Sequence, residues 1–440
     1  ATALLHAAQQ AGADAADALV VEDRSVAVDV RMGALEQAER SEATDLGLRV
    51  FVGQRSAVVS GSDHRRDTLA AMAERAVAMA REAPEDPFAG LADPGQLAST
   101  WDVDGLELCD PSAPPAPDAL EADARRAETA ALAHESVTQV QSASAAYGAQ
   151  EVFTAMSNGF EGGYSRTDRG LSCVAIAGTG SGMERDFDGD SRIFRADLRP
   201  PQDIGKTAAE RALLRLDARK PPTGAFPVLF DERISSTLIG HLLGAMNGAA
   251  IARGISFLKD GLGNDVFAKG IDIVDDPHMR RGHGSRPWDG EGVSTVRRKL
   301  IDDGQLTTWL LNSSAARQLE LSTTGHASRG IGSPPGISAS NVYLPAGKQS
   351  PEALMSGIKN GLLIAEMFGP SLNHNTGEYS VGIAGFAIEN GERARPVSEV
   401  TVAGNLKDIF KSLTPANDLE FRSSINAPSV LIENLTIAGS

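Results

Sequence analysis

The sequence is poor in cysteine and in aromatic residues. Cys109 and Cys173 are its two cysteines, and neither has a second cysteine or a histidine at ligand spacing. Zinc-ribbon and redox motifs are therefore excluded, and we expect both cysteines to be buried free thiols. Aromatic residues make up 5% of the 440 residues, but hydrophobic residues make up 42% and charged residues 22%, as in ordinary globular proteins.

Long hydrophobic runs and an excess of positive charge are also absent. The longest apolar runs, such as GLLIAEMF, are much shorter than the roughly 20 residues that a membrane-spanning helix needs. No charged-then-apolar signal segment opens the chain. The formal net charge of −17 disfavours direct contact with nucleic acid, which relies on Lys and Arg. We therefore expect a soluble, cytoplasmic protein that binds neither nucleic acid nor membranes.

Proline-rich stretches divide the chain into three predicted domains. The stretch from residue 83 to 117 contains APEDPF and DPSAPPAPDA, where proline removes backbone donors and prevents regular pairing. A second break is the proline pair at residues 221 and 222. Helical and strand-like patterns alternate on either side of the first break. We predict an α+β fold, with N-terminal lobes of small sheets covered by helices over residues 1–97 and 98–222, and a β-rich domain over residues 223–440.

Several local motifs indicate where elements begin and turn. The segment RDTLAAMAERAVAMAREA predicts a helix that stops before Pro84. The tripeptides DDG (302–304) and ENG (389–391) separate apolar runs and predict hairpins, because these residues tolerate a positive φ. Asp231 is a candidate N-cap for a helix that follows the apolar run PVLF.

This last helix carries one histidine, His241, and raises the question of a metal site. A zinc protease of the helical type needs two histidine ligands and a glutamate base from one helix. The neighbours Leu242, Ala245 and Met246 supply neither. His241 then either packs inside the protein or lines a cavity shared with a partner.

The loop DDPHMRRGHGSRPWDGEG holds the densest set of polar side chains. Its acids and histidines could gather around a cation: Asp275, Asp276, His278, His283 and Asp289. The competing interpretation is a solvated or subunit-facing loop in which the arginines pair with the acids. His326 stands alone in a glycine-rich segment that lacks a phosphate-loop motif. We keep His278, His283 and His326 as candidates for a cleft or an interface.

Longer motifs in the C-terminal half resemble a known family. SFLKDGLGNDVF, GEGVSTVRRKLIDDGQLTTWLLNSSAARQLELSTTGHA, TGEYSVGIAGFAIENG and PVSEVTVAGNLKDIF are similar to the TldD/PmbA family, also called modulators of DNA gyrase. More narrowly, the chain resembles the PmbA (TldE) branch. The resemblance implies a heterodimeric metalloprotease in which a TldD-like subunit binds zinc through a His-Glu-x-x-x-His helix and a later cysteine.

The family's zinc motif is degenerate when it is carried onto this sequence. With a shared glycine at Gly244, the first histidine falls on Gly240, the glutamate on His241 and the last histidine on Ala245. The cysteine falls within residues 421–425, which read FRSSI. The resemblance therefore implies that this chain has no catalytic residue and no metal ligand, binds no cofactor, and leaves zinc to its partner.

We expect a PmbA/TldE-like, pseudoenzyme subunit of a TldD-type heterodimeric metalloprotease that processes peptides and unfolded polypeptides. Its partners would be a TldD-like catalytic subunit and the substrate chain, and the isolated protein would form a homodimer. One alternative is a self-sufficient metal-dependent peptidase that acts as a homodimer with a metal near His278 and His283. The other is a non-enzymatic peptide-binding module.

Overall fold

Strands from the first two predicted domains form one continuous antiparallel sheet, the long sheet. In the computed structural model, which describes residues 1–439, its strand order is β3-β2-β1-β4-β5-β6. The strands are β1 (Ala15–Arg31), β2 (Ala34–Val52), β3 (Arg55–Gly61), β4 (Val137–Met156), β5 (Glu161–Ala177) and β6 (Glu184–Arg192). β1 pairs with β4 from Asp17–Met156 to Val30–Ala143, which joins the segments on either side of the proline-rich stretch. The boundary at residue 97 stays a prediction.

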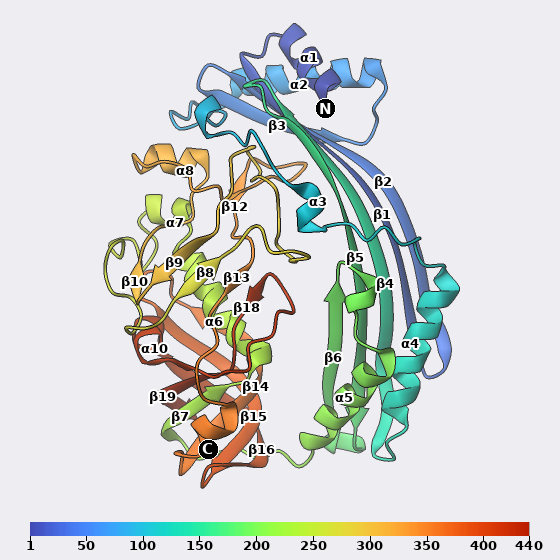
Figure 1. The fold of residues 1–440 in the computed structure, drawn as a ribbon, viewed down its shortest axis with the longest axis vertical. Coiled ribbons are helices and arrows are strands. Elements are labelled where there is room, and N and C mark those ends of the chain that lie inside the picture. Colours follow the sequence, from blue (N-terminus) through green and yellow to red (C-terminus); the bar gives the residue numbers. More distant parts are fainter. Residues whose placement is uncertain (440) are drawn as a thin grey trace.

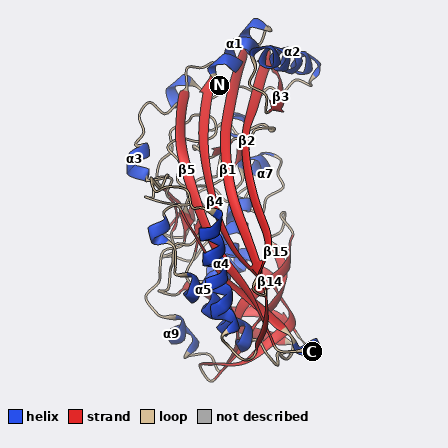
Figure 2. Ribbon diagram, turned by 90° about the vertical axis from the view of Figure 1, so that its right-hand side faces the viewer, coloured by secondary structure: helices blue, strands red, loops and turns tan. Residues whose placement is uncertain are grey.

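The helices of this half pack on one side of the long sheet. They are α1 (Thr2–Gln10) and α2 (Arg66–Glu82) toward one end, and α4 (Pro117–Leu132) and α5 (Pro201–Leu214) toward the other (Figure 2). Ala16 and Ala18 are buried in the α1–α2 core, and Val28 and Val30 in the α4–α5 core. All four residues have even numbers, so they share one face of β1. As predicted, α2 ends at Glu82, before Pro84.

Small side chains let α4 and α5 approach each other closely. Ala124, Ala127 and Ala208 are buried at this contact. A Cβ added at Gly205 of α5 would lie 1.9 Å from the carbonyl oxygen of Ala127. Cys173 is buried below these helices as predicted, whereas Cys109 is exposed. The prediction for Cys109 was wrong because that residue lies in an irregular segment outside both helices and strands.

The proline-rich stretch runs alongside the C-terminal body of the molecule (Figure 1). It contains a short 3-10 turn, η1 (Pro94–Gln96), and α3 (Val103–Leu106), whose N-cap Asp102 accepts a hydrogen bond from the Gly105 N–H. The N–H of Ala98 donates to the Gly292 carbonyl over 2.9 Å. Two further 3-10 turns, η2 (Gly180–Gly182) and η3 (Arg195–Asp197), flank β6.

The C-terminal body contains two larger sheets, which lie beside the concave side of the long sheet (Figure 1). The first has the order β16-β15-β14-β7-β19-β17, with a further pairing of β16 to β19. Its strands are β7 (Gly224–Phe230), β14 (Asn360–Leu372), β15 (Glu378–Glu389), β16 (Glu392–Asn405), β17 (Thr414–Pro415) and β19 (Val430–Ala438). The second is β10-β9-β8-β13-β18, from β8 (Ile273–Asp275), β9 (Arg298–Asp302), β10 (Gln305–Leu306), β13 (Val342–Tyr343) and β18 (Ile425–Asn426).

The remaining elements of the C-terminal body are short, apart from one helix. They are α6 (Glu232–Ala245), α7 (Gly248–Ala252), α8 (Ser313–Gln318), α9 (Pro351–Met355), α10 (Leu406–Ser412) and the pair β11 (Ala327–Ser328) and β12 (Gly336–Ile337). Together with the helix-covered long sheet, these elements confirm the predicted α+β class and the β-rich C-terminal half. None of the described helices has the length and apolarity needed to cross a membrane.

Both predicted hairpins are confirmed. Asp303 and Gly304 connect β9 to β10 with φ angles of 48° and 85°. Asn390 and Gly391 connect β15 to β16 with φ angles of 54° and 86°. Two consecutive residues with positive φ are what a two-residue turn demands, and the sequence supplies residues that tolerate this conformation.

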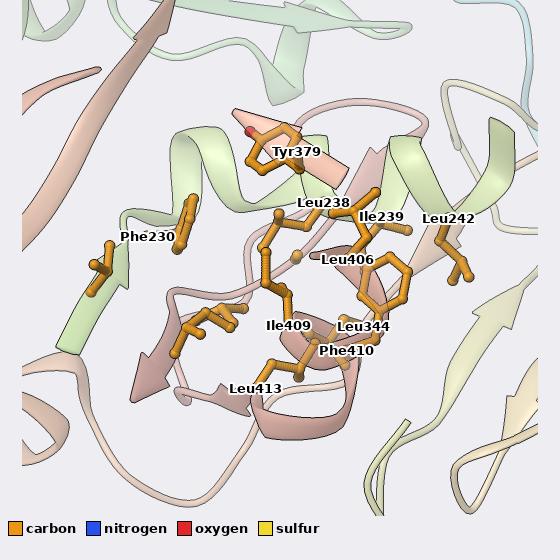
Figure 3. Close-up of a cluster of buried hydrophobic side chains, with 14 of the residues drawn as sticks. Phe230, Leu238, Ile239, Leu242, Leu344, Tyr379, Leu406, Ile409, Phe410 and Leu413 are labelled. Atoms are coloured by element: carbon orange, nitrogen blue, oxygen red, sulfur yellow. The ribbon is translucent and has the colours of Figure 1, made fainter. Parts of the chain in front are cut away.

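Helix α6 lies on the main core of the C-terminal body. Its buried side chains Leu238, Ile239 and Leu242 face Leu406, Ile409 and Phe410 of α10 (Figure 3). Spacings of three and four residues place them on one stripe of the helix. The predicted N-cap is confirmed, because the Asp231 carboxylate accepts a hydrogen bond from the Arg233 N–H over 3.1 Å.

We expect Gly205→Ala to lower the free energy of unfolding by about 1–3 kcal/mol, because the new methyl group must push α4 and α5 apart. Urea denaturation followed by circular dichroism measures the change. Gly240→Ala is the matched control in α6, since a Cβ there meets no atom within 4 Å. The control should raise stability by about 0.5–1 kcal/mol. Equal effects of the two substitutions would contradict the proposed close contact.

Candidate functional site

A cleft separates the edge strand β6 of the long sheet from the C-terminal body. One hollow of about 480 Å³ is lined by Ser172, Phe187 and Gly189 of the sheet and by Arg233 and Arg422 of the body. An adjoining hollow of about 780 Å³ shares Arg233 and extends along β14 and β15. Phe187 is 55% exposed there. The cleft combines apolar and charged walls, which suits a peptide better than a small apolar ligand.

Three buried carboxylates on β6 hold the wall of this cleft in place. Asp186, Asp188 and Asp190 alternate along the strand, so they point to the helix-covered side and are 7%, 2% and 8% exposed. Buried charges need partners. Arg199 and Arg211 each approach Asp188 to 2.8 Å.

One of these carboxylates, Asp186, connects the two halves of the molecule. Arg233 of α6 approaches Asp186 to 3.2 Å. Arg215, which directly follows α5, also pairs with Asp186, over 3.5 Å, and with Glu366 of β14. Because breaking a buried ion pair leaves an uncompensated charge, these contacts fix the long sheet against the C-terminal body.

The first turn of α6 adds an unusual carboxyl group to the cleft. The Glu232 side chain is 17% exposed, and its Oε1 lies 3.1 Å from Nη2 of Arg422. Burial raises the pKa of Glu232 to about 7, although Arg422 opposes the shift. This buried carboxyl group could not be predicted from the sequence, because its burial depends on segments almost 200 residues away.

His241 lies near the other end of α6 and is half-buried. Its ring meets Tyr379 edge-on, with centroids 5.2 Å apart. Its Nε2 is buried without a hydrogen-bond partner. Burial and the nearby His374 lower the pKa of His241, so the imidazole is kept neutral.

The other positions of the degenerate motif differ in their surroundings. A Cβ added at Gly240 or Gly244 would meet no atom within 4 Å, so this stripe of α6 is open. Ala245, in contrast, is 3% exposed and packs in the core. The structure thus places one imidazole and no carboxylate at the motif positions of α6.

The three histidines predicted as cleft or interface candidates lie in different surroundings. His278 is exposed, and its Nε2 lies 3.0 Å from Thr295 Oγ1, in a hollow of about 340 Å³ beside Trp101. His283 is half-buried and lines a separate hollow of about 440 Å³. Burial lowers the pKa of His283, an effect that Asp168 opposes.

His326 is buried within a hydrogen-bonded chain. Its Nδ1 lies 2.7 Å from Thr324 Oγ1, and its Nε2 lies 2.8 Å from Asp275 Oδ2. Burial lowers the pKa of His326. Asp275 also accepts hydrogen bonds from the backbone and hydroxyl of Ser340. This chain of contacts fixes β8 against two loops.

The remaining acids of the polar loop are engaged in other contacts. Asp289 accepts hydrogen bonds from the N–H groups of Glu291, Val293 and Ala327. Burial, together with the Glu291 carboxylate, raises its pKa to about 6. Asp276 pairs with Arg297 over 3.3 Å. Over residues 1–439, no three His, Cys, Asp or Glu side chains gather in a way that could hold a metal ion.

Comparison with known proteins identifies the family. Three domains described as PmbA/TldA metallopeptidase domain 1, central domain and C-terminal domain match residues 16–80, 109–216 and 223–439. The chain is 37% identical to Metalloprotease PmbA of Escherichia coli O157:H7, over 97% of this chain and 92% of that protein. It is 33% identical to the Metalloprotease PmbA homolog of Haemophilus influenzae, over 98% and 94%.

Solved structures share the fold. A modulator of DNA gyrase from Bacteroides thetaiotaomicron superposes with a TM-score of 0.93 at 28% identity, over 100% of this chain and 98% of that one. TldE from Thermococcus kodakarensis has a TM-score of 0.86 at 20% identity, over 99% of both chains. The chain thus carries the three domains of a metallopeptidase family. It belongs to the PmbA/TldD family, which confirms the resemblance seen in its motifs.

We expect Glu232→Gln to raise the melting temperature, relative to the unmodified protein, more at pH 8 than at pH 5. The raised pKa means that the folded state favours the protonated carboxyl. The protonated Glu232 carboxyl contributes stability that is fully present below about pH 4.5 and is lost as the pH rises through about 7. Glutamine does not titrate, so the variant does not lose stability over this pH range. Thermal unfolding followed by circular dichroism measures the effect.

The matched control is Glu420→Gln, which removes an exposed carboxylate from the same Arg422. An identical pH trend in both variants would show that the effect does not come from the burial of Glu232.

Proposed function

We propose that this protein is the PmbA/TldE-like subunit of a TldD-type heterodimeric metalloprotease that acts on peptides and unfolded polypeptides in the cytoplasm. In this proposal the chain supplies no zinc ligand and no catalytic residue. A TldD-like partner holds the zinc and performs hydrolysis. The relatives' names support the metalloprotease context, and the acidic net charge of −17 supports a role without nucleic-acid contact.

The observation that carries the proposal is the side-chain content of α6. A catalytic zinc takes three protein ligands and leaves a position open for water. Gly240 and Ala245, where the family's two histidines fall, have no donor atom, and His241 rests against Tyr379. Ala245 is also packed in the core, where an imidazole would not fit. The residues of this chain therefore do not fit the zinc ion, and we assign it no step in hydrolysis.

The cleft beside β6 supports a role in holding substrate. β6 is the last strand of the long sheet, and its outer edge faces the hollow lined by Phe187, Gly189 and Arg233. An unfolded chain could add to this edge through main-chain hydrogen bonds, which give affinity with little sequence preference. Such a mode suits a subunit that presents varied polypeptides to a separate catalytic centre.

We expect the purified chain to show no chelator-sensitive hydrolysis of an unfolded substrate such as reduced, carboxymethylated lactalbumin. Mixing it with a TldD-like subunit in zinc-containing buffer should produce hydrolysis, which ortho-phenanthroline should abolish. The measurement is the release of new amino termini over time. Each subunit alone, and a mixture with a TldD-like subunit whose motif glutamate is replaced by glutamine, are the controls.

Two outcomes would contradict the proposal. Chelator-sensitive hydrolysis by the isolated chain would favour the self-sufficient peptidase, and its loss in His283→Ala would place the metal near that loop. A TldD-like subunit with full activity that is unchanged by addition of this chain would favour an independent peptide-binding module. Copurification of a TldD-like chain at equal stoichiometry would exclude that module.

A further inference from the structure

Four aromatic side chains gather around Trp101, just before α3, in a chain that has few aromatic residues. The Trp101 ring contacts the rings of Trp288 and Phe160, with centroids 4.7 and 5.9 Å apart. Tyr164 also meets Trp288, with centroids 5.6 Å apart. Trp288 and Phe160 are buried, whereas Trp101 is 37% exposed. The buried rings therefore support an indole that stays accessible to water.

The accessible indole forms part of the wall of the hollow of about 340 Å³ that also contains His278, here called the Trp101 hollow. Leu106 and Pro287 add apolar surface to this wall. The Trp101 hollow shares no lining residue with the two hollows of the cleft beside β6. Ligand sites in proteins usually have volumes of about 300–1,000 Å³, so this one has room for a single long side chain.

The Trp101 hollow contains a carboxylate without a cationic partner. Asp102 directly follows the indole in the chain and lines the same hollow. Its Oδ1 accepts a hydrogen bond from the Gly105 N–H over 2.8 Å, and its Oδ2 has neither a donor nor an ion-pair partner among residues 1–439. No lysine or arginine of the described chain lines the hollow. A negative charge beside an accessible indole therefore has no counter-charge from the protein itself.

An arginine side chain matches this combination of groups. Its guanidinium stacks on aromatic rings, and its N–H groups donate charge-assisted hydrogen bonds to carboxylates. Its aliphatic stem can cover the apolar wall while the charged head meets Asp102. An apolar side chain would leave Asp102 unpaired, and an acidic one would be repelled by it. Lysine has the positive charge but lacks the planar array of donors, so it should fit less well.

We propose that the Trp101 hollow binds an arginine side chain of an unfolded polypeptide, with the guanidinium against Trp101 and hydrogen-bonded to Asp102. The source of this side chain rests on the proposed function, in which the protein holds unfolded polypeptides. The site itself is additional, because it lies outside the cleft beside β6 and gives the bound polypeptide a preferred residue.

Binding of short peptides to the purified chain tests this site. The probe is N-acetyl-Ala-Ala-Arg-Ala-Ala-amide, and the comparison peptide has citrulline in place of arginine, which keeps the shape and removes the charge. We expect the arginine peptide to bind about tenfold more tightly in isothermal titration calorimetry, because hydrogen bonds between charged groups are roughly twice as strong as neutral ones. The same peptide with lysine should also bind more weakly than the arginine peptide.

Asp102→Asn removes the charge but keeps the start of α3, because asparagine caps helices as well as aspartate does. It should weaken binding of the arginine peptide about tenfold and leave binding of the citrulline peptide unchanged. Asp104→Asn is the matched control, since Asp104 lies in the first turn of α3 but does not line the hollow. This control accounts for the general attraction of a basic peptide to a chain of net charge −17.

Trp101→Leu tests the contribution of the indole. It should weaken binding of the arginine peptide about threefold, because the cation–π contact is lost. Near-ultraviolet circular dichroism checks that the remaining aromatic side chains keep their packing.

Three results would each overturn the proposal. They are no binding of the arginine peptide at millimolar concentration, equally tight binding of the citrulline or lysine peptide, and equal effects of Asp102→Asn and Asp104→Asn. All of these readouts measure binding to the isolated chain, whereas the proposed function is tested by hydrolysis in a mixture with a TldD-like subunit. Failure of one is therefore distinguishable from failure of the other.

Discussion

The arrangement of the molecule depends on the burial of three aspartates along one edge strand. Asp186, Asp188 and Asp190 are nearly inaccessible to water, so each requires an arginine. Arg211 lies in α5 and Arg215 directly follows it, whereas Arg233 comes from the C-terminal body. Asp186 binds arginines from both halves and so helps to fix their relative position at the cleft, whereas Asp188 and Asp190 pair with arginines of the long-sheet half. Apolar contact also joins the two halves, because Trp288 of the C-terminal body packs against Met156 and Phe160 of the long-sheet half.

Helix α6 carries both Arg233, which pairs with Asp186, and the positions on which the family's zinc motif falls. Its first turn contributes Arg233 to this pair and Glu232 to the cleft, while its inner stripe packs on α10. The helix is therefore needed for the fold whether or not it carries metal ligands. This explains how Gly240, His241 and Ala245 can occupy the motif positions without loss of the helix. Of these positions, Ala245 packs in the core, whereas a side chain at Gly240 would meet no neighbouring atom, so Gly240 is free to change.

Local features of the fold followed from the sequence, whereas long-range ones did not. The end of α2, the N-cap Asp231 and the two hairpin turns depend on a few adjacent residues, and their chemistry is readable directly. The pairing of β1 with β4 joins segments more than 100 residues apart, and alternation of side chains does not specify a partner strand. Residues 34–43 of β2 are all exposed and show no apolar alternation, so only their pairing with β1 makes this part of the chain a strand. The same holds for the site. That α6 carries a single imidazole could be predicted from the sequence, but the burial of Glu232 and His326 could not.

The central claim is that this chain contributes to a metallopeptidase without binding the metal. The most direct test is the zinc content of the isolated protein, purified from zinc-supplemented cells and dialysed against metal-free buffer, by inductively coupled plasma mass spectrometry. The account predicts far less than one zinc ion per chain, with the same value in His241→Ala and His283→Ala. One zinc ion per chain, lost in either variant, would contradict it.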